Sequence, residues 1–239
     1  MKKYLLLLLI PLMVYAGDGL EYTISGIFSY RSLNAKIGNQ ESSVNHTQIG
    51  LKSSVLIDET KEFYFGATYG KMSFGEELTF SSLPISVATK FSKPSFSIFA
   101  GGLFEPYSFS EDFALVINPE ISYNVSSHSW DISQGTYLEG KVDGKIYFIE
   151  AKLGLLFMYE GNDNFEPYVG FYLDYFRGTV KFTETFSDLT GEQEDTLKPK
   201  LPVMLLVGAN FYYGENLSAG VSAGLVNGLT FSGHLGFTF

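Results

Sequence analysis

The C-terminal segment of this chain alternates between apolar and small or polar residues, and that alternation constrains the fold more than any other feature of the sequence. Between Leu229 and Phe239 every second residue is Leu, Phe or Gly, and the residues between them are Thr, Ser, His or Gly. Successive side chains of a β-strand point to opposite faces of a sheet, whereas the apolar residues of an amphipathic helix recur every three or four positions. A period of two therefore predicts a strand with one apolar face and one polar face.

The same period of two recurs through most of the chain. In each such segment Val, Leu, Ile, Phe and Tyr dominate one face, and Gly, Ser, Thr and Asn dominate the other. The segments predicted to be strands are residues 22–31, 48–57, 63–70, 113–126, 146–159, 165–175, 198–213, 217–225 and 229–239. Residues 73–112 are ambiguous, because 83–91 and 95–104 both alternate, and one of the two is expected to be an outer loop or a short strand. The pattern predicts an all-β fold.

The composition excludes several other classes of protein. Aromatic residues make up 16% of the chain, charged residues 18%, and there are 25 glycines, a mixture too apolar for a disordered chain and unlike that of a helical bundle. A formal net charge of −10 leaves no basic footprint for nucleic acid. The chain has no Cys, which excludes disulfides, thiolate metal sites and a Cys nucleophile. We predict neither a metal site nor a cofactor.

Residues 1–16 have the order of a secretory signal peptide. Two lysines precede an apolar run, and a Val-x-Ala cleavage site ends at Ala16. The apolar run is shorter than the about 20 residues that a membrane-spanning helix needs. We therefore predict that residues 1–16 are a cleaved signal peptide and that residues 17–239 form one exported domain without a transmembrane helix.

The residues on the polar faces distinguish a soluble fold from a membrane fold. A water-soluble β-domain carries Lys, Glu, Thr and Arg on the face that meets water. Here the polar faces are mostly Gly, Ser, Thr, Asn and Tyr, and the apolar faces are rich in Phe and Tyr. This distribution is typical of a barrel whose apolar side meets lipid and whose small side fills a narrow lumen. We predict a closed antiparallel up-and-down transmembrane β-barrel of about ten strands, with eight or twelve as alternatives.

Short and long connections are expected to alternate along the chain, as they do in outer-membrane barrels, with both termini on the periplasmic side. The predicted short turns are residues 58–61, 161–164 and 214–216, and the predicted long outer loops are residues 34–43, 131–140 and 184–199. Asn227 and Gly228 are expected to form a two-residue type I′ turn, which needs positive φ angles at both residues.

Three features together resemble small bacterial outer-membrane β-barrels of the OmpA-like and opacity-protein kind. They are the signal peptide, the strand that opens Phe-Glu-Pro-Tyr-Val-Gly-Phe at residues 165–171, and the alternating terminal strand. The resemblance implies a location in the bacterial outer membrane, reached through the periplasm. No peptidoglycan-binding domain is expected after the barrel, so cell-wall tethering is not implied. The resemblance also implies a C-terminal signal for the barrel assembly machinery at Phe231, Leu235, Phe237 and Phe239.

Charged residues on the polar faces are the main candidates for a site. The residues expected to point into the lumen are Arg31, Lys52, Glu120, Glu150, Lys152 and Asp174. Four of them lie on three consecutive strands at similar depth, so they are expected to meet. Buried charges persist only when they are paired, so this lumen charge network is expected to plug the barrel. The alternative is a lining that selects ions or small polar solutes.

These features predict an integral outer-membrane protein with a narrow polar lumen and a structural or anchoring role in the envelope. The alternative function is a porin-like channel for small solutes or ions. An enzyme that acts on lipid is not predicted, because His46, His128 and His234 are not spaced with Ser and an acid as in a known barrel enzyme. The expected partners are outer-membrane lipid, lipopolysaccharide and the barrel assembly machinery, and the protein is expected to be a monomer.

Overall fold

The computed structural model describes residues 20–58, 60–75, 78–80, 87–89, 92–134, 138–186 and 189–239, and the predicted signal peptide lies outside them. The strands are β1 (Glu21–Ile37), β2 (Gln40–Asp58), β3 (Lys61–Phe74), β4 (Leu78–Phe80), β5 (Val87–Thr89), β6 (Ser92–Ser110), β7 (Phe113–Gln134), β8 (Leu138–Tyr159), β9 (Phe165–Phe186), β10 (Leu189–Pro199), β11 (Val203–Tyr213), β12 (Leu217–Val226) and β13 (Gly228–Thr238). Within the described residues, no helix is long and apolar enough to cross a membrane. The predicted all-β fold is confirmed.

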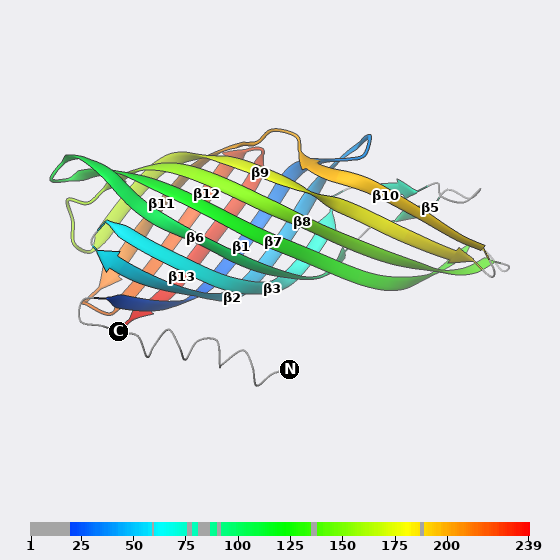
Figure 1. The fold of residues 1–239 in the computed structure, drawn as a ribbon, viewed down its shortest axis with the longest axis horizontal. Helices are drawn as coiled ribbons and strands as arrows, with labels where there is room; N and C mark the ends of the chain where they lie inside the picture. Colours follow the sequence, from blue (N-terminus) through cyan, green and yellow to red (C-terminus); the bar gives the residue numbers. More distant parts are fainter. Residues whose placement is uncertain are drawn as a thin grey trace.

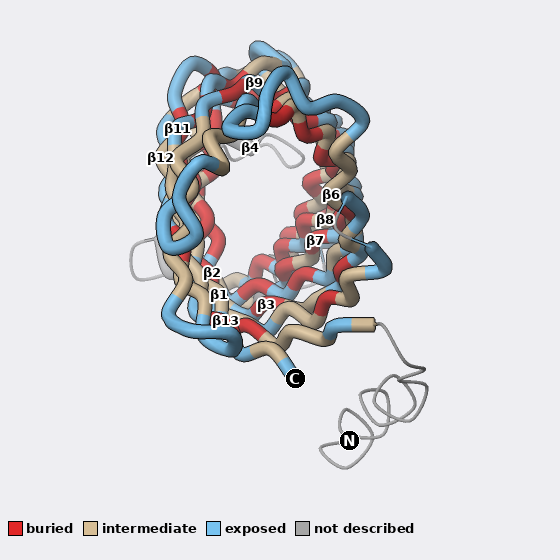
Figure 2. The backbone as a smooth tube through the Cα atoms, turned by 90° about the vertical axis from the view of Figure 1, so that its left-hand side faces the viewer, coloured by how far each residue is buried: buried red, intermediate tan, exposed pale blue. Residues whose placement is uncertain are grey.

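The long strands form one closed antiparallel sheet (Figure 1). Its order is β10-β1-β13-β12-β11-β9-β8-β7-β6-β3-β2, and the pairings β10–β9 and β1–β2 close it into the ring seen in Figure 2. β10 and β11 both pair with β9, through Leu197↔Gly178 and Val203↔Leu173, so they are two parts of one strand. Counting them once leaves ten positions in the 11-stranded sheet. The predicted up-and-down barrel of about ten strands is confirmed.

The ambiguous region contains one barrel strand and one short hairpin. β6 includes residues 95–104 and pairs with β3 and β7 in the ring. β4 and β5 pair only with each other among the described residues, through Leu78↔Thr89, Thr79↔Ala88 and Phe80↔Val87. The expectation of one barrel strand and one short strand agrees with this arrangement, although residues 81–86, 90 and 91 lie outside the described residues.

The barrel has a short end and a long end. The described chain termini and the turns β2–β3, β6–β7, β8–β9 and β11–β12 lie at one end, which we call the periplasmic end (Figure 1). The strands reach different distances toward the opposite, outer end. β7, β8 and β9 have 22 residues each and extend beyond β12 and β13, which have only 10 and 11. We call the part beyond the short strands the outer extension, which comprises residues 33–44, 72–74, 127–148 and 176–199, except the undescribed 135–137, 187 and 188.

The outer extension shows that the prediction of long outer loops is wrong. The pairs Ala35↔Ser42 and Ile132↔Gly140 place two of the predicted loops within paired strands, and β9 and β10 pair through the third. The predicted strands are too short for a physical reason. Beyond the membrane the outward side chains meet water, so they are polar, and the alternation that identifies a lipid-facing strand disappears there.

Apolar side chains surround the barrel on its outer face and form what we call the apolar belt. It includes Phe28, Ile49, Leu51, Phe63, Phe65, Tyr69, Phe96, Ile98, Ile121, Tyr123, Ile149, Leu153, Phe157, Val169, Phe171, Leu173, Tyr175, Leu205, Val207, Val221, Leu225, Phe231, Leu235 and Phe237. Ile49 is 63% exposed and Val221 58%. A soluble protein rarely exposes so large a continuous apolar surface to water. Tyrosines end the belt on its outer side, as in membrane barrels. The belt is therefore the surface that lipid covers.

The interior of the outer extension is filled by buried apolar side chains, which we call the apolar cluster. Its members are Leu33, Ala35, Ile37, Val44, Met72, Phe74, Val142, Ile146, Phe148, Phe176, Val180, Phe182 and Leu197. They come from β1, β2, β3, β8, β9 and β10, so they meet from several sides of the ring. The outer extension is thus held together by an ordinary hydrophobic core.

The hairpin β12–β13 is confirmed, but its turn is not the predicted type I′ turn. The pair Gly224↔Thr230 centres the turn on Asn227, whereas a two-residue turn would be centred between Asn227 and Gly228. The positive φ angles belong to Val226, at 107°, and Gly228, at 136°. The turn is therefore longer than a two-residue loop.

Contacts with neighbouring strands explain this turn. Asn227 is buried; its carbonyl oxygen accepts a hydrogen bond from the Asn34 backbone N–H at 2.8 Å, and its Oδ1 accepts one from the Leu201 N–H at 3.2 Å. Above the hairpin, β10 reaches β1 and pairs with it, through Lys36↔Lys198 and its two neighbouring pairs. Satisfying buried backbone groups at the break between β10 and β11 outweighs the local preference of the Asn-Gly dipeptide.

Substituting Gly228 by Ala is expected to lower the free energy of unfolding by about 1–3 kcal/mol. The φ angle of Gly228 is unfavourable for L residues, and an added Cβ would press on the backbone carbonyl oxygen of Ser32. Gly214→Ala is the matched control, because Gly214 has a φ of 65° but a Cβ there meets nothing within 4 Å. Urea unfolding in detergent micelles measures both variants, and equal losses would argue against the Ser32 contact.

Candidate functional site

Arg31 is the centre of a buried group of ion pairs inside the barrel. Its Nη1 donates a hydrogen bond to Glu150 Oε2 at 2.8 Å, and its Nη2 donates one to Asp174 Oδ2 at 2.6 Å. The side chains of Glu150 and Asp174 are only 2% and 1% exposed. β1 and β8 lie on opposite walls of the ring, five positions apart in the strand order of the closed sheet. Arg31 therefore reaches across the lumen and ties the two walls together.

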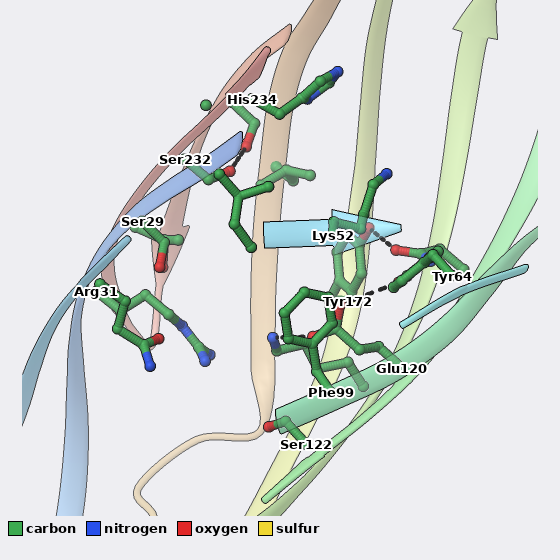
Figure 3. Close-up of a pocket in the computed structure, with 18 of the residues that line it drawn as sticks. Ser29, Arg31, Lys52, Tyr64, Phe99, Glu120, Ser122, Tyr172, Ser232 and His234 are labelled. Atoms are coloured by element: carbon green, nitrogen blue, oxygen red, sulfur yellow. Dashed lines mark hydrogen bonds and ion pairs between the residues drawn. The ribbon is translucent and has the colours of Figure 1, made fainter. Parts of the chain in front are cut away.

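Lys152 and Glu120 extend this group along β7 and β8. Lys152 Nζ lies 2.7 Å from Glu120 Oε1 and 3.5 Å from Glu150 Oε2. The Tyr64 hydroxyl donates to Glu120 Oε2 at 3.1 Å, and Figure 3 shows Tyr64 and Glu120 on the same side of the cavity. The Ser122 hydroxyl donates to Glu150 Oε2 at 3.1 Å. Five of the six charged residues predicted to line the lumen thus lie in one connected group.

Lys52 points inward as predicted, but it lies outside this group. Its Nζ is 3.4 Å from Glu62 Oε1 and 5.1 Å from the centre of the Tyr64 ring. Glu62 was not among the predicted residues, because the strand prediction began at Phe63. The alternation of Tyr64 with Glu62 continues the inward face of β3 by one more step, and this signal could have identified it.

A cavity of about 330 Å³ lies next to the ion pairs, on their periplasmic side (Figure 3). One wall is polar and includes Ser29, Ser222, Ser232 and His234, and the other is apolar and includes Leu156, Met158, Tyr168, Tyr172, Met204 and Leu206. The apolar wall belongs to β8, β9 and β11. The prediction of a polar lumen is therefore right for one side only.

The apolar wall had a signal in the sequence. Residues 155–158 and 204–207 are continuous apolar runs, and in both runs the alternation vanishes. A continuous apolar run is typical of a strand that is apolar on both faces. Here one face meets lipid and the other meets the cavity, so Leu156 and Leu206 are buried while Leu205 is exposed.

The apolar cluster closes the interior on the outer side of the ion pairs. On three of the four strands that carry the group, the next inward residue toward the outer end is apolar: Leu33 follows Arg31, Phe148 precedes Glu150, and Phe176 follows Asp174. On the fourth strand, β7, the polar residue Ser122 follows Glu120. Phe148 and Phe176 lie with their ring centres 5.7 Å apart. The lumen is thus blocked first by charged side chains and then by aromatic and aliphatic ones.

The structure describes the side chains of two of the three histidines, His46 and His234. His46 Nε2 lies 2.7 Å from Ser95 Oγ, a pairing that can activate a serine, and both residues are buried in the barrel interior. His46 lies on the inward face of β2. His234 lines the cavity. The His128 side chain lies outside the part of the chain that the structure describes.

Exposed ion pairs also lie at the two ends of the barrel. At the periplasmic end, Lys61 and Thr60 donate hydrogen bonds to Asp58, and they lower the pKa of this carboxyl to about 2. At the outer end, Lys200 Nζ lies 2.7 Å from Glu41 Oε2 and lowers the pKa of that carboxyl. Both carboxyls are exposed, so these pairs fix local geometry more than they add stability.

The terminal strand carries the residues predicted to form the assembly signal. Phe231, Leu235, Phe237 and Phe239 are all exposed on the outer face of the barrel, with the rings of Phe237 and Phe239 5.1 Å apart. The Phe239 N–H donates to the Tyr22 carbonyl oxygen at 2.9 Å, beside the pairing of β13 with β1. The last residue therefore lies at the seam that closes the ring.

No protein-family model matches this sequence, and no curated protein matches it either. Among solved structures, the chain is similar to the translocator domain of the autotransporter NalP from Neisseria meningitidis, with a TM-score of 0.50, 14% identity, and coverage of 100% of this chain and 94% of that one. It is also similar to the outer membrane protease OmpT from Escherichia coli, with a TM-score of 0.48, 11% identity, and coverage of 93% and 95%.

The likeness to the NalP translocator domain shows the fold, and the apolar belt shows which solvent that fold meets. Together they define the chain as a bacterial outer-membrane β-barrel, as predicted. The predicted location in the bacterial outer membrane agrees with both findings. The narrower resemblance to OmpA-like and opacity-protein barrels stays a prediction.

Proposed function

We propose that this protein is a non-conducting outer-membrane barrel that anchors the outer extension at the cell surface. The apolar cluster carries the proposal. Thirteen buried apolar residues fill the barrel interior beyond the membrane, and such a packed region leaves no continuous path for water or ions. An envelope role of this kind depends on the barrel as an anchor and on the exposed extension as the part that other molecules meet.

The ion pairs support the same proposal. Arg31 connects opposite walls through Glu150 and Asp174, and a cation bound to two carboxylates at this distance is not free to coordinate a passing solute. A selective pore needs charged groups that bind a solute weakly enough to release it. Charges engaged with one another, and buried, act as a plug instead.

A porin-like channel is the second candidate function. The observation that favours it is the cavity of about 330 Å³, whose polar wall offers hydroxyl and imidazole groups to a small solute. For conduction this cavity would have to connect with the outer end through the ion pairs and the apolar cluster. We therefore place the channel second.

Planar-bilayer recordings distinguish the two functions. The purified wild-type protein is expected to insert without reproducible conductance steps, and Glu150→Gln and Lys152→Gln are expected to remain silent. Lys141→Gln is the control, since Lys141 pairs with Asp143 at 3.5 Å on the exposed surface of the outer extension. Steps in the wild type that change in the two lumen variants but not in Lys141→Gln would establish the channel and overturn the plug.

The remaining expectations belong to the same proposal. Residues 1–16 would direct export, and the exposed aromatic residues of β13 would present the signal for the barrel assembly machinery. We also propose that the protein acts as a monomer and without enzymatic activity, although one of the similar barrels, OmpT, is a protease. Deleting Phe239 tests the assembly role, because heat-modifiable barrel should then decrease in the outer-membrane fraction while total protein in the periplasm does not.

A further inference from the structure

The outer wall of the barrel carries cations that have no acidic partner. Within the described part of the chain, Lys71, Lys145, Arg177 and Lys198 have no carboxylate within ion-pair distance. By contrast, the other described cations of the outer wall, namely Lys36, Lys61, Lys141, Lys181 and Lys200, all have one within 3.8 Å. Free cations are unexpected in a chain whose net charge is −10. Their position therefore calls for an explanation.

Two of the free cations belong to a row of three positive charges across adjacent strands. Lys198 of β10 lies directly opposite Lys36 of β1. On its other side, Lys198 neighbours Arg177, because Leu197 pairs with Gly178 of β9. We call Arg177, Lys198 and Lys36 the cationic row.

Like charges opposite one another destabilise a sheet, so the cationic row costs stability unless an anion binds it. Among the described residues, the only carboxylate within ion-pair distance of the row is that of Glu41, whose Oε1 lies 3.8 Å from Lys36 Nζ. Glu41 is already engaged, since Lys200 Nζ lies 2.7 Å from its Oε2. Within the described residues, the chain therefore does not neutralise the row itself.

The row lies just outside the apolar belt. Tyr175, which is 51% exposed, precedes Arg177 by two residues, and the exposed Leu201 follows Lys198 by three. The same order of an outward tyrosine and then a cation recurs at Tyr69 and Lys71 and, on a descending strand, at Lys145 and Tyr147. At about 3.3 Å per residue, the cations lie where hydrocarbon gives way to the headgroups of the outer leaflet.

We propose that the cationic row binds the phosphate groups of a phosphorylated glycolipid of the outer leaflet, the chemistry of lipid A in lipopolysaccharide. Arginine offers a planar pair of donors that fits a phosphate, and lysines on both sides add point charges. The acyl chains of the same lipid would cover the apolar belt below Tyr175 and Leu201. A bound lipid would also relieve the repulsion within the row.

The test is the unfolding temperature of the detergent-solubilised protein, followed by heat-modifiable migration on a gel. Diphosphorylated lipid A is expected to raise the midpoint, whereas dephosphorylated lipid A and inorganic phosphate at the same concentration are not. Arg177→Gln/Lys198→Gln is expected to weaken the apparent affinity for diphosphorylated lipid A roughly 30-fold, given what two surface cations contribute near an anionic membrane. Without lipid, this variant is expected to unfold at the wild-type temperature or higher.

Lys61→Gln/Lys141→Gln is the matched control, because it removes two exposed lysines of the outer wall that lie away from the row and should keep the full lipid response. Arg177→Lys/Lys198→Arg, which keeps both charges, should also keep most of it. The proposal is overturned if dephosphorylated lipid A stabilises the wild type equally, or if the double Gln variant responds like the wild type. It is also overturned if inorganic phosphate alone produces the shift, or if the control loses the response to the same extent.

Discussion

Replacing Arg31 by Met is expected to lower the free energy of unfolding by about 3–5 kcal/mol, the cost of leaving buried charges without a partner. Glu150 and Asp174 are almost fully buried, and both bind the Arg31 guanidinium. Without it, Glu150 still has Lys152, at 3.5 Å, and the hydroxyl of Ser122, but it loses the cation that lies closest to it among the described residues. Methionine fills much of the space but supplies neither charge nor hydrogen bonds, so the loss is electrostatic.

Urea unfolding in detergent micelles measures this effect, and two further variants test its cause. Arg31→Met/Glu150→Gln/Asp174→Asn removes the charges together and is expected to recover most of the lost stability, since a neutral buried group has no uncompensated charge. Lys141→Met breaks the exposed pair with Asp143 and is expected to cost less than about 1 kcal/mol. If the triple variant were no more stable than Arg31→Met, packing and not charge would explain the loss.

Truncating Phe148 and Phe176 together is expected to open the barrel. Both rings belong to the apolar cluster, and they contact each other directly beyond the ion pairs. Removing a buried Phe side chain leaves a cavity and costs about 3–5 kcal/mol. In the double variant Phe148→Ala/Phe176→Ala the two cavities merge beside Glu150 and Asp174, and water can enter from the outer end. Planar-bilayer recordings should then show conductance steps that the wild type lacks.

The matched control for this variant is Ile149→Ala/Tyr175→Ala. These residues neighbour the two phenylalanines on β8 and β9 but face outward in the apolar belt. The control is expected to stay silent, because the interior is unchanged. Heat-modifiable migration confirms that each variant is folded before recording. A folded double Phe variant without conductance would mean that the ion pairs alone close the lumen.

The fold could be predicted from the sequence because one physical rule acts along the whole membrane part. Lipid outside and a narrow lumen inside impose a period of two, so the inward phase of Glu150 and the outward phase of Phe231 follow from alternation. The rule fails where the surroundings change. In the outer extension water replaces lipid, so the strands through Ala35 and Ile132 carry polar outward residues and resemble loops.

The site was less predictable, because its contacts join strands that are far apart in the sequence. Alternation places Arg31 and Asp174 on inward faces. The order of strands around the ring then places β1 opposite β8, and this order brings Arg31, and not Lys52, to the carboxylates of Glu150 and Asp174. The prediction of a type I′ turn at Asn227 was wrong for a similar reason. Its backbone is held by Asn34 of another strand, which a local turn rule does not include.

The pairing of β10 with β1 above the short hairpin changes the width of the molecule. The circumference of a barrel depends on its number of strands, and beyond Asn227 the ring lacks β12 and β13. The molecule therefore tapers toward the outside of the cell. Because the interior is narrower there, side chains of the size of Leu33 and Val180 can fill it together with the rest of the apolar cluster. The outer extension therefore does not need a separate plug segment inside the barrel.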